Sequence, residues 1–347
     1  MPLEIVTPDG REFRYREYAL PELGPDDVRV RVEFAAPKHG TESSALTGSS
    51  HKGKRWDAEL RLFLPVAEAE SASPGERRVG NTVVGAVIAA GSRVTRFRRG
   101  DRVFAYGPIC EEYQLPESRW RLLEGLSEEE AVCADPAHVA LVAVRDGNIR
   151  IGDQVAVFGL GAIGLLVAQI ARASGATWVA AVDPVPHRRE LALAHGADLA
   201  LDPREGDVAL AIKRATGNQG VDVALEVSAS GAALHEAIRC IRQCGTVVQV
   251  AWGPKAGMAL HLDEEFHVNR PALIASQAVW NNPDRSAPLW NEERARQTAI
   301  ELFRRQRITA RGIVTPIIPF REAADVLAEA MNSPQHGIKV GVTFPSG

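Results

Sequence analysis

The sequence predicts an α/β protein with two domains, one rich in β-strands and one built on a parallel, doubly wound sheet. Its 347 residues exceed the length of one typical domain, which is about 150 residues. The residue pattern also changes near position 150, from short strands separated by turns to apolar strands that alternate with helices. Such an alternation is typical of a doubly wound parallel sheet.

The first part of the chain has the pattern of a β-rich domain. Residues 28–34 alternate apolar and polar side chains, which is the period of a half-buried strand. A second strand is predicted at 82–91, and the turn at 100–101 leads into a third. Between them, residues 49–78 are polar and contain glycine and proline, so we expect a long surface excursion there.

The second part of the chain repeats a unit of one strand and one helix. Apolar stretches of strand length recur along it, at 154–158, 177–182, 223–227, 246–250 and 273–276. Cys240 and Cys244 fall in a helix predicted between two of these strands. They lie one helical turn apart there, and we expect them to pack in the core.

The last stretch of the chain contains two further helical patterns and two strand patterns. These pieces are too few to form a third core, so we expect the tail to return to the first domain. The predicted parts are the start of the β-rich domain, the sheet domain and the returning tail, at 1–125, 126–290 and 291–347.

A glycine-rich turn follows the first strand of the predicted parallel sheet. The segment Gly159-Leu160-Gly161-Ala162-Ile163-Gly164 lies directly after an apolar strand and opens a helix. In this context the glycines permit a tight turn, a close approach of the backbone to a pyrophosphate, and close packing of the helix on the strand. The free N–H groups at the start of the helix also favour phosphates. The turn therefore predicts a dinucleotide-binding site.

The end of the next strand indicates which dinucleotide is bound. Asp183 stands where a carboxylate accepts a hydrogen bond from the ribose 2′-hydroxyl. It predicts NAD rather than NADP, because a carboxylate repels a 2′-phosphate. His187, Arg188 and Arg189 lie close by and would soften this preference, with Arg188 as a further candidate contact, although the charged first turn of a surface helix is the simpler explanation. Ser228, which follows the strand at 223–227, is also a candidate cofactor contact.

Composition excludes several other classes of protein. Lys and Arg total 40 and Asp and Glu total 44, a balance that argues against a generally basic nucleic-acid-binding protein. No apolar run is long enough to span a membrane, and the first residues lack the pattern of a signal peptide, so we expect a cytoplasmic protein without a membrane partner. The four cysteines form no CxxC pair, which argues against a disulfide scaffold.

Together these features resemble the medium-chain dehydrogenase/reductase superfamily along nearly the whole chain. The segments that carry the resemblance are 24–30, 85–87, 100–103 and 152–164. The resemblance implies a GroES-like catalytic domain, split in the sequence around a Rossmann domain, with the active site in the cleft between the two. It also implies a small-molecule substrate and a homodimer formed through the last strands of the Rossmann sheet.

The residues at the metal positions depart from the zinc-dependent members of that superfamily. Where those members carry a first Cys ligand this chain has His39, and where they carry a His ligand it has Asn81. Asp135 holds the third position, and the lobe with four structural cysteines is missing. An amide binds zinc weakly, and no thiolate is present to hold it, so we expect no zinc. A weak metal site of His39, Asp135 and Glu42 is the alternative.

Without zinc, a side chain must accept the hydroxyl proton and stabilise the developing alkoxide. His39 is the first candidate, because it holds the lost ligand position and titrates near neutral pH. Lys38 is the second, since a partly desolvated lysine can act as a base. Thr41 matches the hydroxyl that relays protons in zinc-dependent relatives, and Glu42 would orient His39 or bind substrate hydroxyls. Each candidate also has a non-catalytic explanation. His39 and Lys38 would be solvated loop residues, Thr41 would cap a turn, and Glu42 would form a structural salt bridge.

Four residues are candidates for contact with the substrate. Asn81 and Asp135 hold former metal-ligand positions and would make polar contacts to a polyhydroxylated substrate. His138 shares a helix face with Asp135 and is either a proton-exit group or a buried core histidine. Trp280 follows the last predicted Rossmann strand and either stacks on a sugar ring or packs in an interface.

The sequence therefore predicts an NAD-dependent, zinc-independent oxidoreductase that interconverts a secondary alcohol and its ketone. A sugar, cyclitol or polyol is the expected substrate. One alternative is an NAD(P)H-dependent reductase of activated C=C bonds or quinones. The other is a nucleotide-binding protein that lost catalysis together with its metal, which a fold alone does not exclude.

Overall fold

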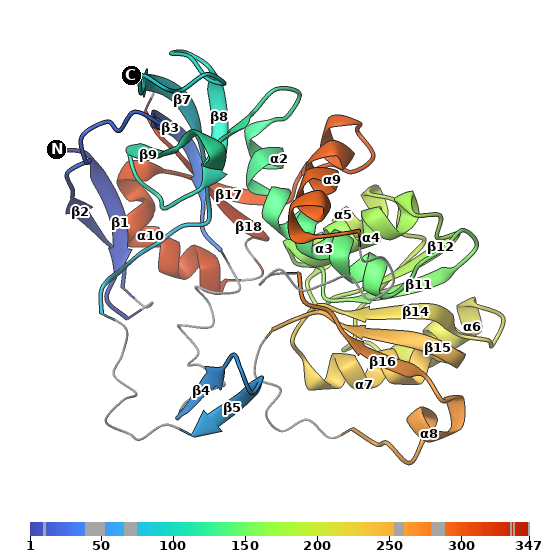
Figure 1. Cartoon of the computed structure of the whole chain (residues 1–347). Helices are drawn as coiled ribbons and strands as arrows, with labels where there is room; N and C mark the ends of the chain where they lie inside the picture. The colour runs from blue at the N-terminus through green and yellow to red at the C-terminus, as the bar shows by residue number, and fades with distance from the viewer. Residues whose placement is uncertain are drawn as a thin grey trace. The chain divides into compact units, whose positions relative to one another are not determined.

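The computed structural model describes residues 1–9, 12–38, 53–65, 75–252, 260–278, 289–333, 335 and 337–345. The chain divides into two compact units (Figure 1). The first comprises Met1–Val132 and Thr315–Gly347, and the second comprises Cys133–Val314. The α/β fold class predicted from the sequence is confirmed.

The central strand of the first unit is β3 (Asp27–Ala36). Its side chains alternate between buried and partly exposed over the first residues, with Val28, Val30 and Val32 in the core, as the period-2 pattern predicts. The order of the main sheet is β10-β8-β7-β3-β18-β17, and β9 also pairs with β3. Its other strands are β7 (Thr82–Ala90), β8 (Arg102–Tyr106), β9 (Glu112–Pro116), β10 (Arg121–Leu122), β17 (Val314–Pro319) and β18 (Lys339–Thr343).

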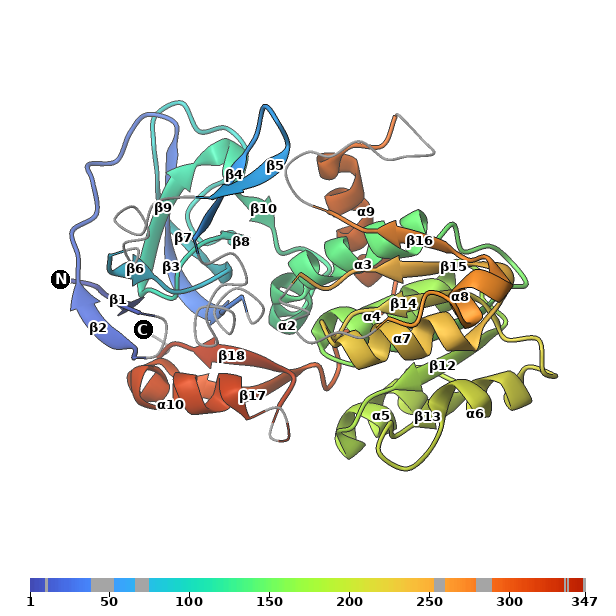
Figure 2. The same cartoon turned by 90° about the horizontal axis from the view of Figure 1, so that it is seen from below.

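The tail of the chain completes this sheet. β18 pairs antiparallel with β3, so that Val342 lies opposite Ala35. α10 (Phe320–Asn332) packs against β18, as Figure 2 shows. The smaller elements of this unit are β1 (Leu3–Thr7), β2 (Arg14–Glu17), β4 (Lys54–Asp57), β5 (Leu62–Pro65), β6 (Arg77–Arg78), η2 (Glu117–Arg119) and α2 (Glu128–Val132).

The second unit is a parallel sheet of order β13-β12-β11-β14-β15-β16. Its strands are β11 (Gln154–Phe158), β12 (Trp178–Val182), β13 (Leu199–Leu201), β14 (Val221–Glu226), β15 (Ile241–Gln249) and β16 (Ala272–Ala275). The strand order reverses direction between β11 and β14. At such a switch point, open α/β sheets bind their ligands beyond the carboxyl ends of the strands.

Helices cover both faces of this sheet. α4 packs on β11 and β12 and α3 packs on α4, whereas α7 packs on β14 from the other side (Figure 1, Figure 2). The helices of the unit are α3 (Ala134–Asp146), α4 (Ala162–Ala173), α5 (Pro186–Ala194), α6 (Val208–Ala215), α7 (Gly231–Cys240), α8 (Glu265–Asn269) and α9 (Glu292–Arg304).

The tail returns to the first unit later than the sequence suggests. The prediction starts the returning tail at residue 291, which includes α9, but α9 belongs to the second unit. Its apolar face, with Ala295, Ala299 and Phe303, is buried, and the helix packs on α3. Conversely, α2 stays with the first unit because it packs on β3 and β7.

The prediction that Cys240 and Cys244 share a helix is wrong. α7 ends at Cys240, which is buried, whereas Cys244 lies in β15 and is exposed, with a φ of +58°. The register between β14 and β15 shifts between Val221 and Val223. The extra residues that β15 carries at this shift form a bulge, which places Cys244 outside the core.

A buried amide ties α4 to the segment after α9. Gln169 is 6% exposed, and its Oε1 accepts a hydrogen bond from the backbone N–H of Thr309 at 2.8 Å. Its Nε2 donates to the carbonyl oxygen of Thr309 at 3.2 Å and lies 3.2 Å from Nδ1 of His195. This one side chain therefore satisfies both backbone groups of Thr309.

We expect Gln169→Ala to lower the free energy of unfolding by about 1–3 kcal/mol, because it leaves two partly buried backbone groups without their partner. Chemical denaturation followed by circular dichroism measures this change. Gln297→Ala is the matched control, since the Gln297 amide is exposed and bonds only to Glu293 among the described contacts; its expected effect is within about 0.5 kcal/mol. Equal effects of the two variants would contradict the role given to Gln169.

Candidate functional site

The glycine-rich turn lies at the carboxyl end of β11, at the switch point of the sheet. Gly159 has a φ of +94°, and a Cβ at this position would lie 2.7 Å from the Cβ of Ser228. A Cβ on Gly164 would lie 1.8 Å from the carbonyl oxygen of Gly159. Gly161 differs, because no heavy atom lies within 4 Å of a Cβ built on it. The turn is therefore tightly packed on its inner side and open on its outer side.

The open side of the turn carries the start of α4. Gly161 is the N-cap of this helix and has no side chain with which to cap it. The first N–H groups of a helix have no partner within the helix, and the helix dipole adds a partial positive charge there. An open helix start beside a glycine is a fitting site for a phosphate. Leu160, in contrast, is fully buried and holds the turn in the core.

Asp183 connects the end of β12 to this turn. The residue is buried, at 4% exposed. Its Oδ2 accepts a hydrogen bond from the backbone N–H of Leu160 at 2.7 Å, and its Oδ1 accepts one from Val185 at 2.8 Å. The Nη1 atom of Arg188 lies 3.8 Å from Oδ2. Burial lowers the pKa of the Arg188 guanidinium, and the Asp183 carboxylate partly offsets this.

Ser228 and Glu226 form the neighbouring wall at the end of β14. Glu226 is fully buried, and its Oε1 accepts hydrogen bonds from the backbone N–H of Ser228 at 2.6 Å and from its hydroxyl at 2.7 Å. The Ser228 hydroxyl in turn accepts from the N–H of Ser230 at 3.1 Å. Ser228 is thus fixed against Gly159 by a buried carboxylate. Glu226 was not among the site residues predicted from the sequence, although a lone acid at the end of an apolar strand was the available signal.

A second cluster lies beside Asp183, and two of its members, Asp202 and Arg204, were not predicted from the sequence. Asp202, which follows β13, is buried and accepts hydrogen bonds from the guanidinium groups of Arg189 and Arg204. The side-chain hydrogen bond from Arg204 is the main cause that holds the pKa of Asp202 well below its usual range. Because β12 and β13 are neighbouring parallel strands, the two acids that follow them end at the same edge of the sheet.

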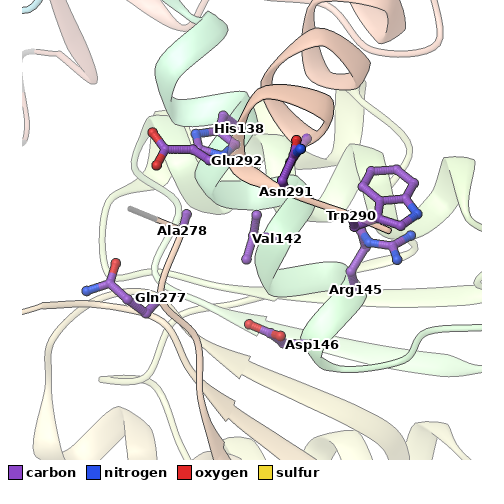
Figure 3. Close-up of a pocket in the computed structure, with 10 residues that line it drawn as sticks. His138, Val142, Arg145, Asp146, Gln277, Ala278, Trp290, Asn291 and Glu292 are labelled. Atoms are coloured by element: carbon purple, nitrogen blue, oxygen red, sulfur yellow. The ribbon is translucent and has the colours of Figure 1, made fainter. Parts of the chain in front are cut away.

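The second unit also has a small polar pocket between α3, the start of α9 and the segment after β16, as Figure 3 shows. Its volume is about 40 Å³, which is room for about three water molecules and too little to bury a sugar. His138, one of the predicted substrate contacts, is fully buried in its wall. The lining residues are His138, Val142, Arg145, Asp146, Gln277, Ala278, Trp290, Asn291, Glu292 and Ala295.

The two remaining described candidates for the substrate lie in different units. Asp135 is buried in the first turn of α3. Asn81 belongs to the first unit and is also buried; its backbone N–H donates to the carbonyl oxygen of Ala36 at 2.9 Å. Both polar side chains are therefore withdrawn from solvent. Buried polar groups are uncommon and are normally hydrogen-bonded, so these two residues are not part of an ordinary solvated surface.

Lys38 is half-buried just after β3. Beside it, Lys339 of β18 is 3% exposed and donates from Nζ to the carbonyl oxygen of Pro37 at 3.1 Å. This buried ammonium fixes the backbone directly before Lys38. The sequence analysis missed Lys339, although a lysine inside the apolar strand at 338–342 was a readable signal.

Four of the sequence candidates, His39, Thr41, Glu42 and Trp280, lie outside the described residues. Among the described residues, no group of three or more His, Cys, Asp or Glu side chains is placed to hold a metal ion. Burial raises the pKa of the Cys110 thiol to about 12, so this cysteine stays neutral at ordinary pH and is a poor metal ligand. No helix in the described part of the chain is long and apolar enough to cross a membrane.

Comparison with known proteins gives a consistent family. A family model described as zinc-binding dehydrogenase matches residues 162–280. The chain is 36% identical to D-guloside 3-dehydrogenase of Escherichia coli (strain K12), over 98% of this chain and 99% of that protein. It is 32% identical to (R,R)-butanediol dehydrogenase of Bacillus subtilis (strain 168), over 72% of this chain and 77% of that protein.

Solved structures with the same fold include two bacterial oxidoreductases. An Escherichia coli oxidoreductase/dehydrogenase of unknown specificity superposes with a TM-score of 0.78 at 18% identity, over 100% of both chains. A putative zinc-binding dehydrogenase from Sinorhizobium meliloti 1021, bound to NADP, gives a TM-score of 0.75 at 23% identity over 99% of each chain. With the sequence relatives, these matches show that the chain belongs to the medium-chain dehydrogenase/reductase superfamily and is a dehydrogenase that acts on CH–OH donors.

Proposed function

We propose that the protein is an NAD-dependent dehydrogenase that interconverts a secondary hydroxyl of a sugar, cyclitol or polyol and the corresponding ketone, without catalytic zinc. The observation that carries the nucleotide part is the packed turn at Gly159 and Gly164, open at Gly161, with the start of α4 behind it. The substrate class is supported by the similarity to D-guloside 3-dehydrogenase over almost the full length of both chains.

The cofactor residues fit a nicotinamide dinucleotide. The open amides at the start of α4 would hold the pyrophosphate, and the carboxylate of Asp183 would accept from the ribose. When bound, the nicotinamide ring accepts the hydride from the substrate carbon. Arg188 beside Asp183 and the NADP bound to one structural neighbour make NADP the second candidate. Ser228 would contribute by keeping the opposite wall of the turn in place.

The acid–base chemistry is assigned to the segment that follows β3. His39 would accept the proton of the substrate hydroxyl, with Lys38 as the second candidate. Thr41 would relay the proton, and Glu42 would orient His39 or bind substrate hydroxyls. The ammonium of Lys339 supports this assignment, because it fixes the peptide carbonyl of Pro37 one residue before Lys38. Asn81, Asp135, His138 and Trp280 are the residues proposed to contact the substrate.

The chemistry of the donor set argues against zinc. An amide at Asn81 is a weak zinc ligand, and a carboxylate at Asp135 would need further imidazole or thiolate ligands beside it. We therefore assign the charge stabilisation at the reacting oxygen to side chains of the protein. The alternative is a metal held by His39, Asp135 and Glu42.

The first experiment combines metal analysis with a substrate panel. We expect NAD⁺ reduction with glycosides or polyols, no stoichiometric zinc, and turnover that persists after chelation. Stoichiometric metal with chelator-sensitive turnover would contradict the zinc-free mechanism. Turnover of enones or quinones alone would indicate a reductase, and bound NAD without any turnover would indicate a nucleotide-binding protein that has lost catalysis.

A pair of variants tests the base. His39→Ala should lower kcat by about 10²–10⁴-fold, the usual contribution of a general base, while the Kd for NAD⁺ stays constant because the groups proposed to hold the dinucleotide are the amides of the glycine turn and the carboxylate of Asp183. His267→Ala, which removes an exposed histidine of α8, is the control and should leave kcat unchanged. An unchanged kcat in His39→Ala together with a large loss in Lys38→Met would move the role to Lys38.

The exposed edge strand β16 of the parallel sheet supports the proposal that the protein forms a homodimer. β16 is the last strand in the sheet order, and its Leu273 side chain is 43% exposed. An uncovered apolar edge strand is a site where a second chain can pair. Light scattering after size-exclusion chromatography should give twice the mass of the chain, and Leu273→Lys should shift the protein towards the monomer. A monomeric wild-type protein would refute this assembly.

A further inference from the structure

Asp202 is a buried carboxylate at the centre of an ion cluster beside the proposed ribose site. Arg204 binds it through two atoms, with Nε 2.9 Å from Oδ1 and Nη2 2.6 Å from Oδ2. Nη1 of Arg189 donates to Oδ2 at 3.0 Å, and the backbone N–H of Arg204 donates to Oδ1 at 3.0 Å. The Asp202 side chain is only 2% exposed. A buried carboxylate with this many charge-assisted hydrogen bonds is anionic and held in one orientation.

Both arginines also reach from Asp202 to the turn that carries Asp183. Nη1 of Arg189 donates to the carbonyl oxygen of Asp183 at 2.8 Å. Nη2 of Arg204 donates to the carbonyl oxygen of Pro184. Two guanidinium groups thus connect one carboxylate to two successive carbonyl groups. The position of the Asp183 turn therefore depends on Asp202, although the two side chains share no direct hydrogen bond among the described contacts.

The same cluster controls the charge at this edge of the sheet. In dinucleotide-binding folds, an acid in the position of Asp183 favours NAD, and an arginine nearby accommodates the 2′-phosphate of NADP. Arg189 and Arg204 lie close enough for the second role, because both touch the backbone of the Asp183 turn. However, each of them is already paired with Asp202. This pairing neutralises part of their charge and engages Nη1 of Arg189 and Nε and Nη2 of Arg204.

We propose that Asp202 is a positioning residue that sets the choice between NAD and NADP. It holds the Asp183 turn in place for a ribose hydroxyl and withholds Arg189 and Arg204 from a 2′-phosphate. This inference rests on the proposed nucleotide-dependent function. Asp202 lies outside the glycine-rich turn, and we expect its carboxylate to strengthen the binding of NAD and to weaken the binding of NADP.

The test is the Kd of NAD⁺ and of NADP⁺, measured by calorimetry for the wild-type protein and three variants. Asp202→Asn keeps the shape and removes the charge, so NAD⁺ should bind several-fold more weakly and the NADP⁺/NAD⁺ affinity ratio should rise about tenfold, as expected for one charge near a surface phosphate. Arg204→Gln should move the ratio in the opposite direction, because it leaves an excess of negative charge. The double variant Asp202→Asn/Arg204→Gln should lose the rise in the NADP⁺/NAD⁺ affinity ratio that Asp202→Asn alone produces.

Asp222→Asn is the matched control. Asp222 also combines an arginine contact, with Arg242, and a backbone contact, with the N–H of Gln154 at 2.7 Å. It lies at the amino end of β14, on the opposite edge of the same sheet. Both dissociation constants should stay within about twofold in this variant, because Asp222 lies at the opposite end of the strands from the Asp183 turn and the Coulombic effect of a partly exposed charge is screened over about 10 Å.

The outcomes separate this inference from the proposed function. A wild-type protein that binds neither nucleotide would overturn both. A wild-type protein that binds NAD⁺, together with an Asp202→Asn variant that weakens both nucleotides equally, would leave the function standing and overturn the role of Asp202. If Asp202→Asn does not fold, Arg204→Gln decides the question, because its side chain is 66% exposed; an unchanged affinity ratio in that variant would overturn the inference.

Discussion

The arrangement of the second unit depends on one steric constraint, which is that no side chain fits at Gly164. A Cβ there would lie 1.8 Å from the carbonyl oxygen of Gly159, so only glycine lets α4 rest against the end of β11. Because the helix begins directly at the carboxyl edge of the sheet, its first amides lie at the point where the strand order reverses. The chemistry of this edge is thus a consequence of packing.

The neighbouring strand ends are built onto that constraint. The carboxylate of Asp183 accepts from the N–H of Leu160 and so joins the end of β12 to the turn. From the other side, the backbone of Gly159 approaches Ser228 so closely that a Cβ would not fit, and Glu226 holds Ser228 in place. The ends of three strands are therefore joined by contacts at one edge of the sheet. A cofactor bound there would meet prearranged groups, which lowers the ordering cost of binding.

Features encoded by local sequence could be predicted, and those encoded by long-range packing could not. The strand at 154–158 matches β11 to the residue, because a buried parallel strand is a continuous apolar run. The glycine turn and Asp183 follow directly after apolar strands in the sequence, so their positions in the fold could be predicted from local pattern alone. The boundary at Thr315 was missed, since the burial of α9 against α3 depends on the other helix. The bulge at Cys244 was missed because it depends on the pairing of β14 with β15.

The cluster around Asp202 illustrates this limit in physical terms. The sequence contains two similar dipeptides, Asp183-Pro184 and Asp202-Pro203, each at the end of a short apolar strand. Nothing local relates them. The parallel register of β12 and β13, with Val182 opposite Leu201, brings both acids to one edge of the sheet. The guanidinium groups of Arg189 and Arg204 pair with the Asp202 carboxylate and also donate to the carbonyl oxygens of Asp183 and Pro184, so they join the two strand ends. The electrostatics of the proposed ribose site is therefore set by strand register, which a motif at one strand end does not contain.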